Sequence, residues 1–291
     1  MKDIIVFGNS YQGAYTAQRS SFFKGLLGCP EFSVAIDSVY RDYLAGIIPD
    51  AVAGARTFTG EEFNADLAVS IGGDGTFLHT ANRIGSRQTP IMGLNSGHLG
   101  YLSAAPMDSL ESILGDIAAD RYIVEPRTML EASCDTHRIQ RRPYALNEAV
   151  VLRQDTGQMI AVDTYVDGCQ IASYEGDGLI VATPTGSTAY SLSAGGPIIA
   201  PTAANMVLTP LAPHSLNMRP LVVSDTAVIE LVPKARSSTF TLSLDGATRP
   251  LPVGTRVRLA KAPFVTNVVK LRHHTFADTL RSKLLWGVNS R

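Results

Sequence analysis

The chain has 291 residues, with 25 Lys and Arg against 26 Asp and Glu, so its formal net charge at neutral pH is −1. This balance argues against a dedicated nucleic-acid-binding protein, which usually carries a strongly basic domain. The length suggests about two domains, and a 45% hydrophobic content excludes a disordered chain. Any anionic ligand must therefore be held by local geometry rather than by bulk charge.

Short apolar runs alternate with helical composition over the first hundred residues. Runs at 4–7, 32–36, 67–71 and 90–94 are typical of strands, and residues 76–84 have the composition of a helix. The first run is too short for the core of a signal peptide. Continuous apolar strands separated by helices predict βαβ units and a parallel sheet that is covered on both faces.

The composition changes after about residue 118, where segments rich in Val, Ile and Tyr predict strands. Asp-Gly at 167–168 and at 245–246 suits type I′ hairpin turns, because both central positions of that turn need positive φ. We therefore expect an all-β second half, followed by a terminal helix over 276–285. The predicted strands of this half are 143–153, 159–166, 169–174 and 255–259.

Three cysteines, Cys29, Cys134 and Cys169, lie far apart and form no Cys-x-x-Cys pair. This pattern excludes a disulfide framework and is typical of free thiols in a reducing cytoplasm. Residues 178–218 carry no charged side chain, but five prolines interrupt them. No stretch offers the roughly 20 continuous apolar residues of a membrane span, so we expect a cytoplasmic protein with no membrane partner.

The first candidate site is Gly72-Gly73-Asp74-Gly75-Thr76, between a predicted strand and a predicted helix. Glycines let the backbone approach a phosphate, and a helix N-terminus supplies free N–H donors. A carboxylate would repel that phosphate unless it binds a metal or accepts the proton of an attacking hydroxyl. The alternative is a tight turn in which Asp74 caps the helix. The motif is neither a P-loop nor a Rossmann fingerprint.

Two further candidates follow along the chain. The loop from Asn95 to Tyr101 also follows a strand, so both loops are expected at one sheet edge, where ligands of open α/β sheets bind. Its alternative is a glycine-rich connection. The pair Asn147-Glu148 offers an amide and a carboxylate that can hold ribose hydroxyls or a base edge, and its alternative is a solvent-facing pair at a strand end. Asp37, at the end of the second strand, is expected to act as a cap.

The segment from Asp177 to Pro197 is the fourth candidate, because a strand runs into a loop of hydroxyl-bearing and small residues with one tyrosine, Tyr190. Small residues allow a flat base to approach, and hydroxyls donate to sugar or phosphate without charge. The chain has no His-Glu-x-x-His motif and no Gly-x-Ser-x-Gly motif, so neither a catalytic zinc site nor a hydrolase triad is predicted.

Taken together, these motifs resemble the NAD kinase family. The resemblance rests on Gly72–Thr76, on Asn95-x-Gly97-x-Leu99-Gly100, on Asn147-Glu148 and above all on the segment from Asp177 to Pro197. The Gly-Gly-Asp-Gly element alone is shared with diacylglycerol, sphingosine and phosphofructokinase-type kinases, whereas the Thr-Pro-Thr-Gly-Ser-Thr-Ala-Tyr-Ser run is much more specific. Tyr101 departs from the usual pattern, in which phenylalanine is common.

The resemblance implies transfer of the γ-phosphate of ATP to the 2′-hydroxyl of the adenosine ribose of NAD, with Mg²⁺ as the expected divalent cation. It implies an N-terminal Rossmann-like parallel α/β domain (1–118 with a returning tail, 266–291) and a C-terminal β-sandwich-like domain (119–265). It also implies a homodimer or a homotetramer. A lipid or sugar kinase with the same glycine loop and a non-catalytic dinucleotide-sensing module remain alternatives.

The resemblance also assigns roles to individual positions. Asp74 is implied as the general base. Asn147 and Glu148 are implied to hold the base and the ribose hydroxyls, and Tyr190 to offer a stacking face. The remaining residues implied to bind nucleotide are Gly72, Gly73, Gly75, Thr76, His79, Asn95, Tyr101, Asp177, Thr188, Ala189, Ser191, Leu192, Ser193, Ala212 and His214.

Overall fold

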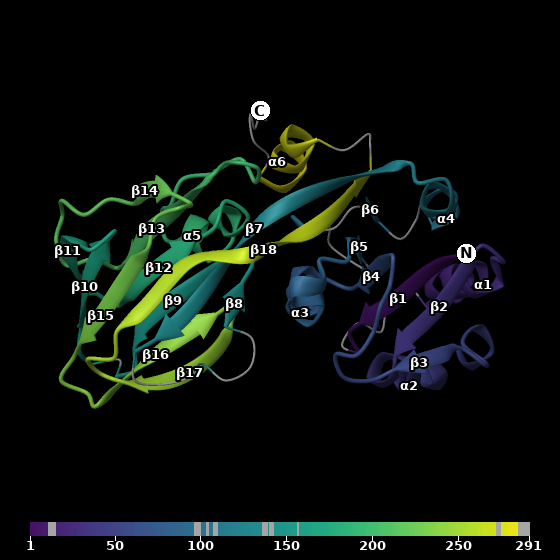
Figure 1. The fold of residues 1–291 in the computed structure, drawn as a ribbon, viewed down its shortest axis with the longest axis horizontal. Helices are drawn as coiled ribbons and strands as arrows, with labels where there is room; N and C mark the ends of the chain where they lie inside the picture. The colour runs from purple at the N-terminus through teal and green to yellow at the C-terminus, as the bar shows by residue number, and fades with distance from the viewer. Residues whose placement is uncertain are drawn as a thin grey trace, which may run out of the picture. The chain divides into compact units, whose positions relative to one another are not determined.

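The computed structural model describes residues 1–10, 16–95, 100–102, 105–106, 110–135, 139, 143–155, 157–271 and 275–284. The chain forms two compact units, Met1–Pro126 with Thr266–Arg291 and Arg127–Val265 (Figure 1). The predicted domain boundaries, at 118/119 and 265/266, stay a prediction. None of the helices in the described ranges is long and apolar enough to cross a membrane.

The first unit is built on a parallel sheet in the order β5-β4-β1-β2-β3. Its central strands are short runs of apolar residues that are buried almost throughout, as expected for a sheet covered on both faces. The α/β prediction for this half is confirmed. The strands are β1 (Lys2–Gly8), β2 (Phe32–Asp37), β3 (Arg56–Phe58), β4 (Leu67–Ile71), β5 (Ile91–Asn95) and β6 (Ala105–Pro106).

The first, second and fourth helices of this unit pack apolar side chains against the sheet. Phe22 and Phe23 of the first helix and Ile113 of the fourth lie in the same core as the strand residues Val6 and Val69. The helices are α1 (Thr16–Gly28), α2 (Ser38–Ile47), α3 (Asp74–Ile84), α4 (Leu110–Ala118) and, from the returning tail, α6 (Phe276–Leu284). The helices predicted at 76–84 and 276–285 correspond to α3 and α6.

Asp37 ends β2 and caps α2, as its position predicted, because its side chain accepts the N–H of Tyr40 at 3.4 Å. Its other oxygen lies 2.5 Å from Nη1 of Arg83, and the two side chains are 13% and 9% exposed. The Arg83 guanidinium also lies 4.8 Å from the centroid of the Phe7 ring. The ion pair therefore ties α3 to β2 within a largely buried setting.

Replacing Asp37 with alanine is expected to lower the free energy of unfolding by about 3 kcal/mol, because it leaves the Arg83 guanidinium buried without its counter-charge. Urea unfolding measures the loss. The matched control is Asp42→Ala, since Asp42 forms an exposed pair with Arg41 at 3.5 Å, worth less than about 1 kcal/mol. Equal effects in the two variants would contradict the prediction.

The second unit contains two groups of antiparallel strands with one core between them, which confirms the predicted sandwich-like all-β half. One sheet has the order β14-β13-β12-β9-β16-β17. Its strands are β14 (Leu221–Ser224), β13 (Asn205–Leu211), β12 (Gly178–Ala182), β9 (Glu148–Arg153), β16 (Thr239–Leu244) and β17 (Ala247–Pro252). The other group comprises β11 (Cys169–Gly176), β10 (Ile160–Val166), β15 (Ile229–Lys234), β8 (Tyr144–Ala145) and parts of β7 (Tyr122–Cys134) and β18 (Val257–Leu271).

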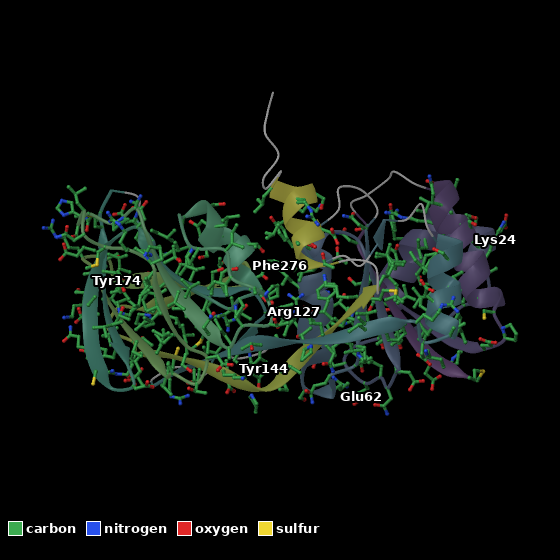
Figure 2. All side chains as sticks on the ribbon, turned by 90° about the horizontal axis from the view of Figure 1, so that it is seen from above. Lys24, Glu62, Arg127, Tyr144, Tyr174 and Phe276 are labelled. Atoms are coloured by element: carbon green, nitrogen blue, oxygen red, sulfur yellow. The ribbon has the colours of Figure 1, made fainter. Side chains whose placement is uncertain are left out.

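Side chains from both groups of strands fill the interior of the second unit, where Tyr174 is 4% exposed (Figure 2). Tyr144 packs edge-on against Phe264, with ring centroids 4.7 Å apart. Both predicted Asp-Gly hairpin turns are present with positive φ at each central residue: 50° and 79° at 167–168, and 47° and 83° at 245–246. The turn chemistry of the sequence therefore sets the register of both hairpins.

Candidate functional site

Asp74 is the first residue of α3. The N-cap position of this helix is occupied by Gly73, which has no side chain that could cap it. The alternative in which Asp74 caps its own helix is therefore wrong. Its carboxylate instead accepts the backbone N–H of Tyr101 at 3.0 Å and that of Leu102 at 3.2 Å, one on each oxygen. Each carboxylate oxygen has two lone pairs, so Asp74 can still accept a hydroxyl proton.

The glycine loop and the loop after β5 meet at one edge of the sheet, as predicted. Ile71 and Leu94 pair in adjacent parallel strands, and the N–H of Gly72 donates to Leu94 O at 2.9 Å. Asn95 is 2% exposed at the end of β5. The family motif residues 96–99 lie outside the described residues. The backbone at Gly100 approaches the Asp74 carboxylate so closely that a Cβ there would lie 1.9 Å from Oδ1 of Asp74.

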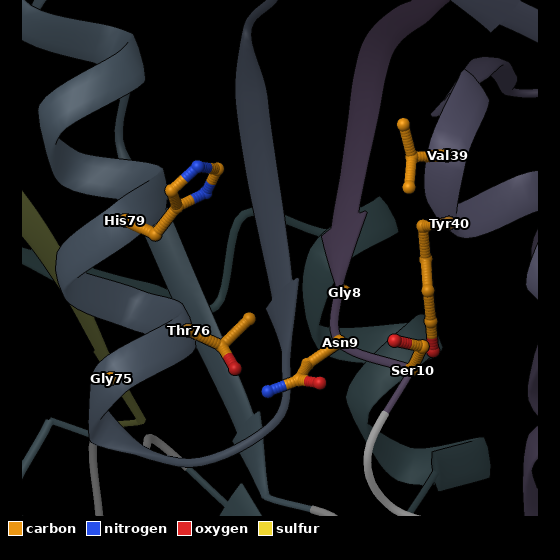
Figure 3. Close-up of a pocket in the computed structure, with 8 residues that line it drawn as sticks. All are labelled: Gly8, Asn9, Ser10, Val39, Tyr40, Gly75, Thr76 and His79. Atoms are coloured by element: carbon orange, nitrogen blue, oxygen red, sulfur yellow. The ribbon is translucent and has the colours of Figure 1, made fainter.

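A cavity of about 260 Å³ lies beside the glycine loop (Figure 3). It opens between the end of β1, the start of α2 and the first turns of α3, which is the edge where open α/β sheets bind ligands. Thr76 Oγ1 is buried and has no hydrogen-bond partner among the described residues. The lining residues are Gly8, Asn9, Ser10, Val39, Tyr40, Gly75, Thr76 and His79.

Two residues of the first unit share the electrostatic environment of Asp74. Burial raises the pKa of Tyr101, and the negative charge of Asp74 raises it further. Burial lowers the pKa of Lys283 in α6, while Asp74 acts in the opposite direction. The site residues that the family resemblance implies do not include Lys283, because no motif links a lysine in the tail to a carboxylate about two hundred residues earlier.

In the second unit, Asn147 and Glu148 lie at the start of β9, and each is 8% exposed. The alternative of a solvent-facing pair is therefore wrong. The Glu148 carboxylate accepts the backbone N–H of Tyr190, whereas its Oε2 is buried without a hydrogen-bond partner among the described residues. A buried acceptor left open in this way is available to a ligand hydroxyl.

Two buried carboxylates lie next to each other here. Burial, and after it the charge of Asp245, raises the pKa of Glu148 to about 7. Burial also raises the pKa of Asp245 to about 6, although N–H groups of Leu146, Asn147 and Glu148 oppose that shift. Since the folded-state pKa of Glu148 exceeds its ordinary value of 4.5, its contribution to stability is present below about pH 4.5 and is lost as pH rises through about 7.

Glu148→Gln is expected to raise the free energy of unfolding at pH 8 by up to about 3 kcal/mol, because the variant has no carboxyl to ionise. Most of this gain should disappear at pH 5, where Glu148 is protonated. Urea unfolding of the ligand-free protein at both pH values measures it. Glu62→Gln, at an exposed position, serves as the control and should show no gain at either pH. A pH-independent effect of Glu148→Gln would contradict the prediction.

The predicted hydroxyl-rich loop follows β12 and contains the short helix α5 (Tyr190–Ser193). Tyr190 is 45% exposed, so its ring face is open. Ser191 is fully buried, and its hydroxyl lies 2.8 Å from that of Thr209. This side chain holds the loop from the inside, whereas the remaining predicted residues of the loop, Thr188, Ala189, Leu192 and Ser193, are half-buried or exposed.

Asp177, Ala212 and His214 form a separate group at the other end of β12. The N–H of Asp177 donates to Leu211 O, and that of His214 to Glu175 O, both at 2.9 Å. Arg153 Nε lies 2.7 Å from Oδ1 of Asp177. The five residues of β12 span roughly 17 Å, so the structure does not bring this group to Glu148 and Tyr190.

Comparisons with known proteins agree with one another. The family models described as "ATP-NAD kinase N-terminal domain" and "ATP-NAD kinase C-terminal domain" match residues 38–122 and 146–271. The chain is 40% identical over 286 residues to an NAD kinase of Bacteroides fragilis, covering 98% of both chains. It is 41% identical over 296 residues to one of Porphyromonas gingivalis, covering 100% of both.

Two solved structures have a similar fold. A yeast NADH kinase in complex with NADH matches with a TM-score of 0.86 and 26% identity, over 100% of this chain and 89% of the other. An NAD kinase from Archaeoglobus fulgidus in complex with ATP matches with a TM-score of 0.70 and 27% identity, over 99% and 98%.

Proposed function

The chain belongs to the NAD kinase family, and we propose from this premise that it transfers the γ-phosphate of ATP to the 2′-hydroxyl of the adenosine ribose of NAD, giving NADP. It is a kinase.

The orientation of the Asp74 carboxylate carries the proposal. Two backbone N–H groups hold both oxygens, and among the residues that the structure describes each oxygen keeps one lone pair for an incoming hydroxyl. In this proposal Asp74 accepts the proton of the ribose hydroxyl as the oxygen attacks the γ-phosphorus, and the bond from that phosphorus to the β–γ bridging oxygen breaks, so that ADP leaves. A weak base is sufficient, because phosphoryl transfer depends mainly on positioning and on charge stabilisation.

Asn147 and Glu148 are proposed to hold the acceptor. The open oxygen of Glu148, Oε2, is buried, so a ribose hydroxyl that donates to it would supply its missing hydrogen bond. Tyr190 directs its backbone N–H to Glu148 and leaves its ring exposed, so that ring is proposed to stack on a base. These three residues would then recognise the sugar and the base from neighbouring positions in the fold.

The phosphate chain of ATP is proposed to lie near the glycine loop and the cavity beside it. The N–H groups of Asp74 and Gly75, the first two residues of α3, have no acceptor within the helix, which suits an anion in a protein of nearly zero net charge. The implied divalent cation fits this arrangement. The described residues contain no group of three His, Cys, Asp or Glu that could hold a metal, and Mg²⁺ commonly binds through substrate phosphates with one or two carboxylates. When bound, it offsets phosphate charge.

We also propose a homodimer or homotetramer located in the cytoplasm. The strand β14 lies at the edge of its sheet and exposes Leu221 and Val222, near an 88% exposed Leu216. An exposed apolar edge strand is a pairing surface that another copy can cover. Sedimentation of the purified protein measures the assembly.

The proposed location in the cytoplasm rests on the three cysteines. They are free thiols, which fits a reducing compartment.

Incubation of the purified protein with NAD, ATP and Mg²⁺ tests the proposed reaction, with NADP detected through a strictly NADP-dependent dehydrogenase. A sample without ATP is the control, and a parallel sample with NADH compares the two acceptors. NADP formation that requires ATP supports the proposal. Turnover of a lipid or sugar instead of NAD, or tight NAD binding without turnover with any donor, would contradict it.

A further inference from the structure

The segment Leu146–Glu148 has an acceptor or a donor for each of its backbone polar groups. Its three N–H groups all donate to one side chain, Asp245: Leu146 to Oδ2 at 2.7 Å, Asn147 to Oδ1 at 2.8 Å and Glu148 to Oδ1 at 3.1 Å. The Asp245 N–H in turn donates to Glu148 O at 3.1 Å.

The other side of the segment is held by Thr183, which is fully buried. Its hydroxyl donates to Leu146 O at 2.6 Å, and its backbone N–H donates to Asn147 O at 2.9 Å. The same hydroxyl accepts the N–H of Gly186 at 3.1 Å. Thr183 therefore links the segment to the loop that leads to Tyr190.

This arrangement uses three N–H groups and three carbonyl groups, so the backbone of Leu146–Glu148 has one conformation and the side chains of Asn147 and Glu148 leave it in fixed directions. We propose that Asp245 and Thr183 are positioning residues for the dinucleotide: they act through Asn147 and Glu148 and set the affinity for NAD. The proposal rests on the proposed function, because it takes these two residues as ligands of NAD.

Asp245→Asn is the sharpest test at the first position. An amide has only one oxygen, so its NH₂ group must face either the N–H of Leu146 or those of Asn147 and Glu148, donor against donor. A displaced binding group costs about tenfold to a hundredfold. We therefore expect the dissociation constant and KM for NAD to rise by about that factor, with KM for ATP unchanged within about twofold.

The chain offers a matched control in Asp167, which occupies the same position of the other Asp-Gly hairpin turn, with a φ of 50° against 47°. Among the residues that the structure describes, its side chain accepts one N–H group, that of Val228 at 2.9 Å, and it is exposed. Asp167→Asn therefore makes the same chemical change in the same turn and should leave the affinity for NAD unchanged.

Thr183 supplies a second pair of variants if Asp245→Asn fails to fold. Thr183→Val keeps the shape and removes the hydroxyl, whereas Thr183→Ser keeps the hydroxyl and removes only a methyl group. We expect the valine variant to bind NAD about tenfold more weakly or worse and the serine variant to bind within about threefold of the unchanged protein.

Three measurements separate the outcomes: NAD binding by calorimetry, steady-state kinetics with each substrate, and hydrogen exchange of the 146–148 amides. Faster exchange together with weaker NAD binding supports the proposal. Faster exchange with unchanged NAD binding, or equal losses for Thr183→Val and Thr183→Ser, would reduce these residues to a structural role and overturn it. If the unchanged protein neither binds nor phosphorylates NAD, the proposed function itself fails, and that result is visible before any variant is made.

Discussion

Replacing Asp74 with asparagine is expected to lower kcat by about 10²- to 10⁴-fold, the usual contribution of a general base. The amide can no longer take the proton of the ribose hydroxyl. In the unchanged protein, the N–H groups of Tyr101 and Leu102 donate to the two carboxylate oxygens at 3.0 and 3.2 Å. In the variant, the NH₂ group of the amide must face one of these two N–H groups. The coupled assay for NADP measures kcat, and calorimetry measures NAD binding.

The control for this variant is Asp66→Asn. Asp66 is exposed just before β4, and its side chain also accepts a backbone N–H, that of Asp3 at 2.8 Å. We expect full activity and unchanged unfolding in urea from this variant, whereas Asp74→Asn should stay folded but lose about 1–3 kcal/mol of stability, because one N–H group loses its acceptor. Wild-type turnover by Asp74→Asn would remove Asp74 from the chemistry, and the base would then have to be another group.

Replacing Gly186 with alanine is expected to lower the free energy of unfolding by about 3 kcal/mol. A Cβ at this position would lie 2.0 Å from the carbonyl oxygen of Asn147 and 2.4 Å from its carbonyl carbon. Both are backbone atoms, which cannot rotate away as a side chain can. Urea unfolding measures the loss, and a rise in the dissociation constant for NAD should accompany it, because Asn147 must move.

Gly46→Ala is the matched control, since Gly46 lies in α2 and no atom of the described part of the chain lies within 4 Å of the position of its missing Cβ. Alanine is the better helix former, so this variant should gain up to about 1 kcal/mol. A stability of Gly186→Ala equal to that of the unchanged protein would show that Asn147 can yield, and the tight packing around it would then have no energetic consequence.

The sequence predicts four strands of the first unit, because β1, β2, β4 and β5 are apolar runs that end at glycines or at a polar residue, and it does not predict the short strands β3 and β6. The strand β7 escapes the prediction. It carries Glu125, Pro126 and Arg127 in its middle, and its first half is largely exposed. Alternation of apolar and polar residues, the usual signal of a half-buried strand, is lost in such a segment.

The residues of the candidate site also differ in whether a local sequence pattern reveals them. Asp74 is visible in the sequence because a glycine corner between a strand and a helix is a local pattern. The role of Asp245 is not, because the three N–H groups that it accepts lie 97 to 99 residues earlier in the chain. Lys283 is a similar case. Local motifs identify the groups that we propose to touch ligand, whereas the groups that orient them come from pairings that only the fold creates.

The second unit is an insertion in the first, since the chain leaves the first unit at Pro126 and returns to it at Thr266. On the ribosome, the first unit therefore cannot be completed until the whole second unit has been synthesised. Until then β5 lacks the neighbour that it later gains at Val268 of β18, and an open strand edge can pair with other chains. Early folding of the second unit would shorten the time during which the edge of β5 is open. The solubility of the unfinished first unit on the ribosome therefore depends on how fast the inserted second unit folds.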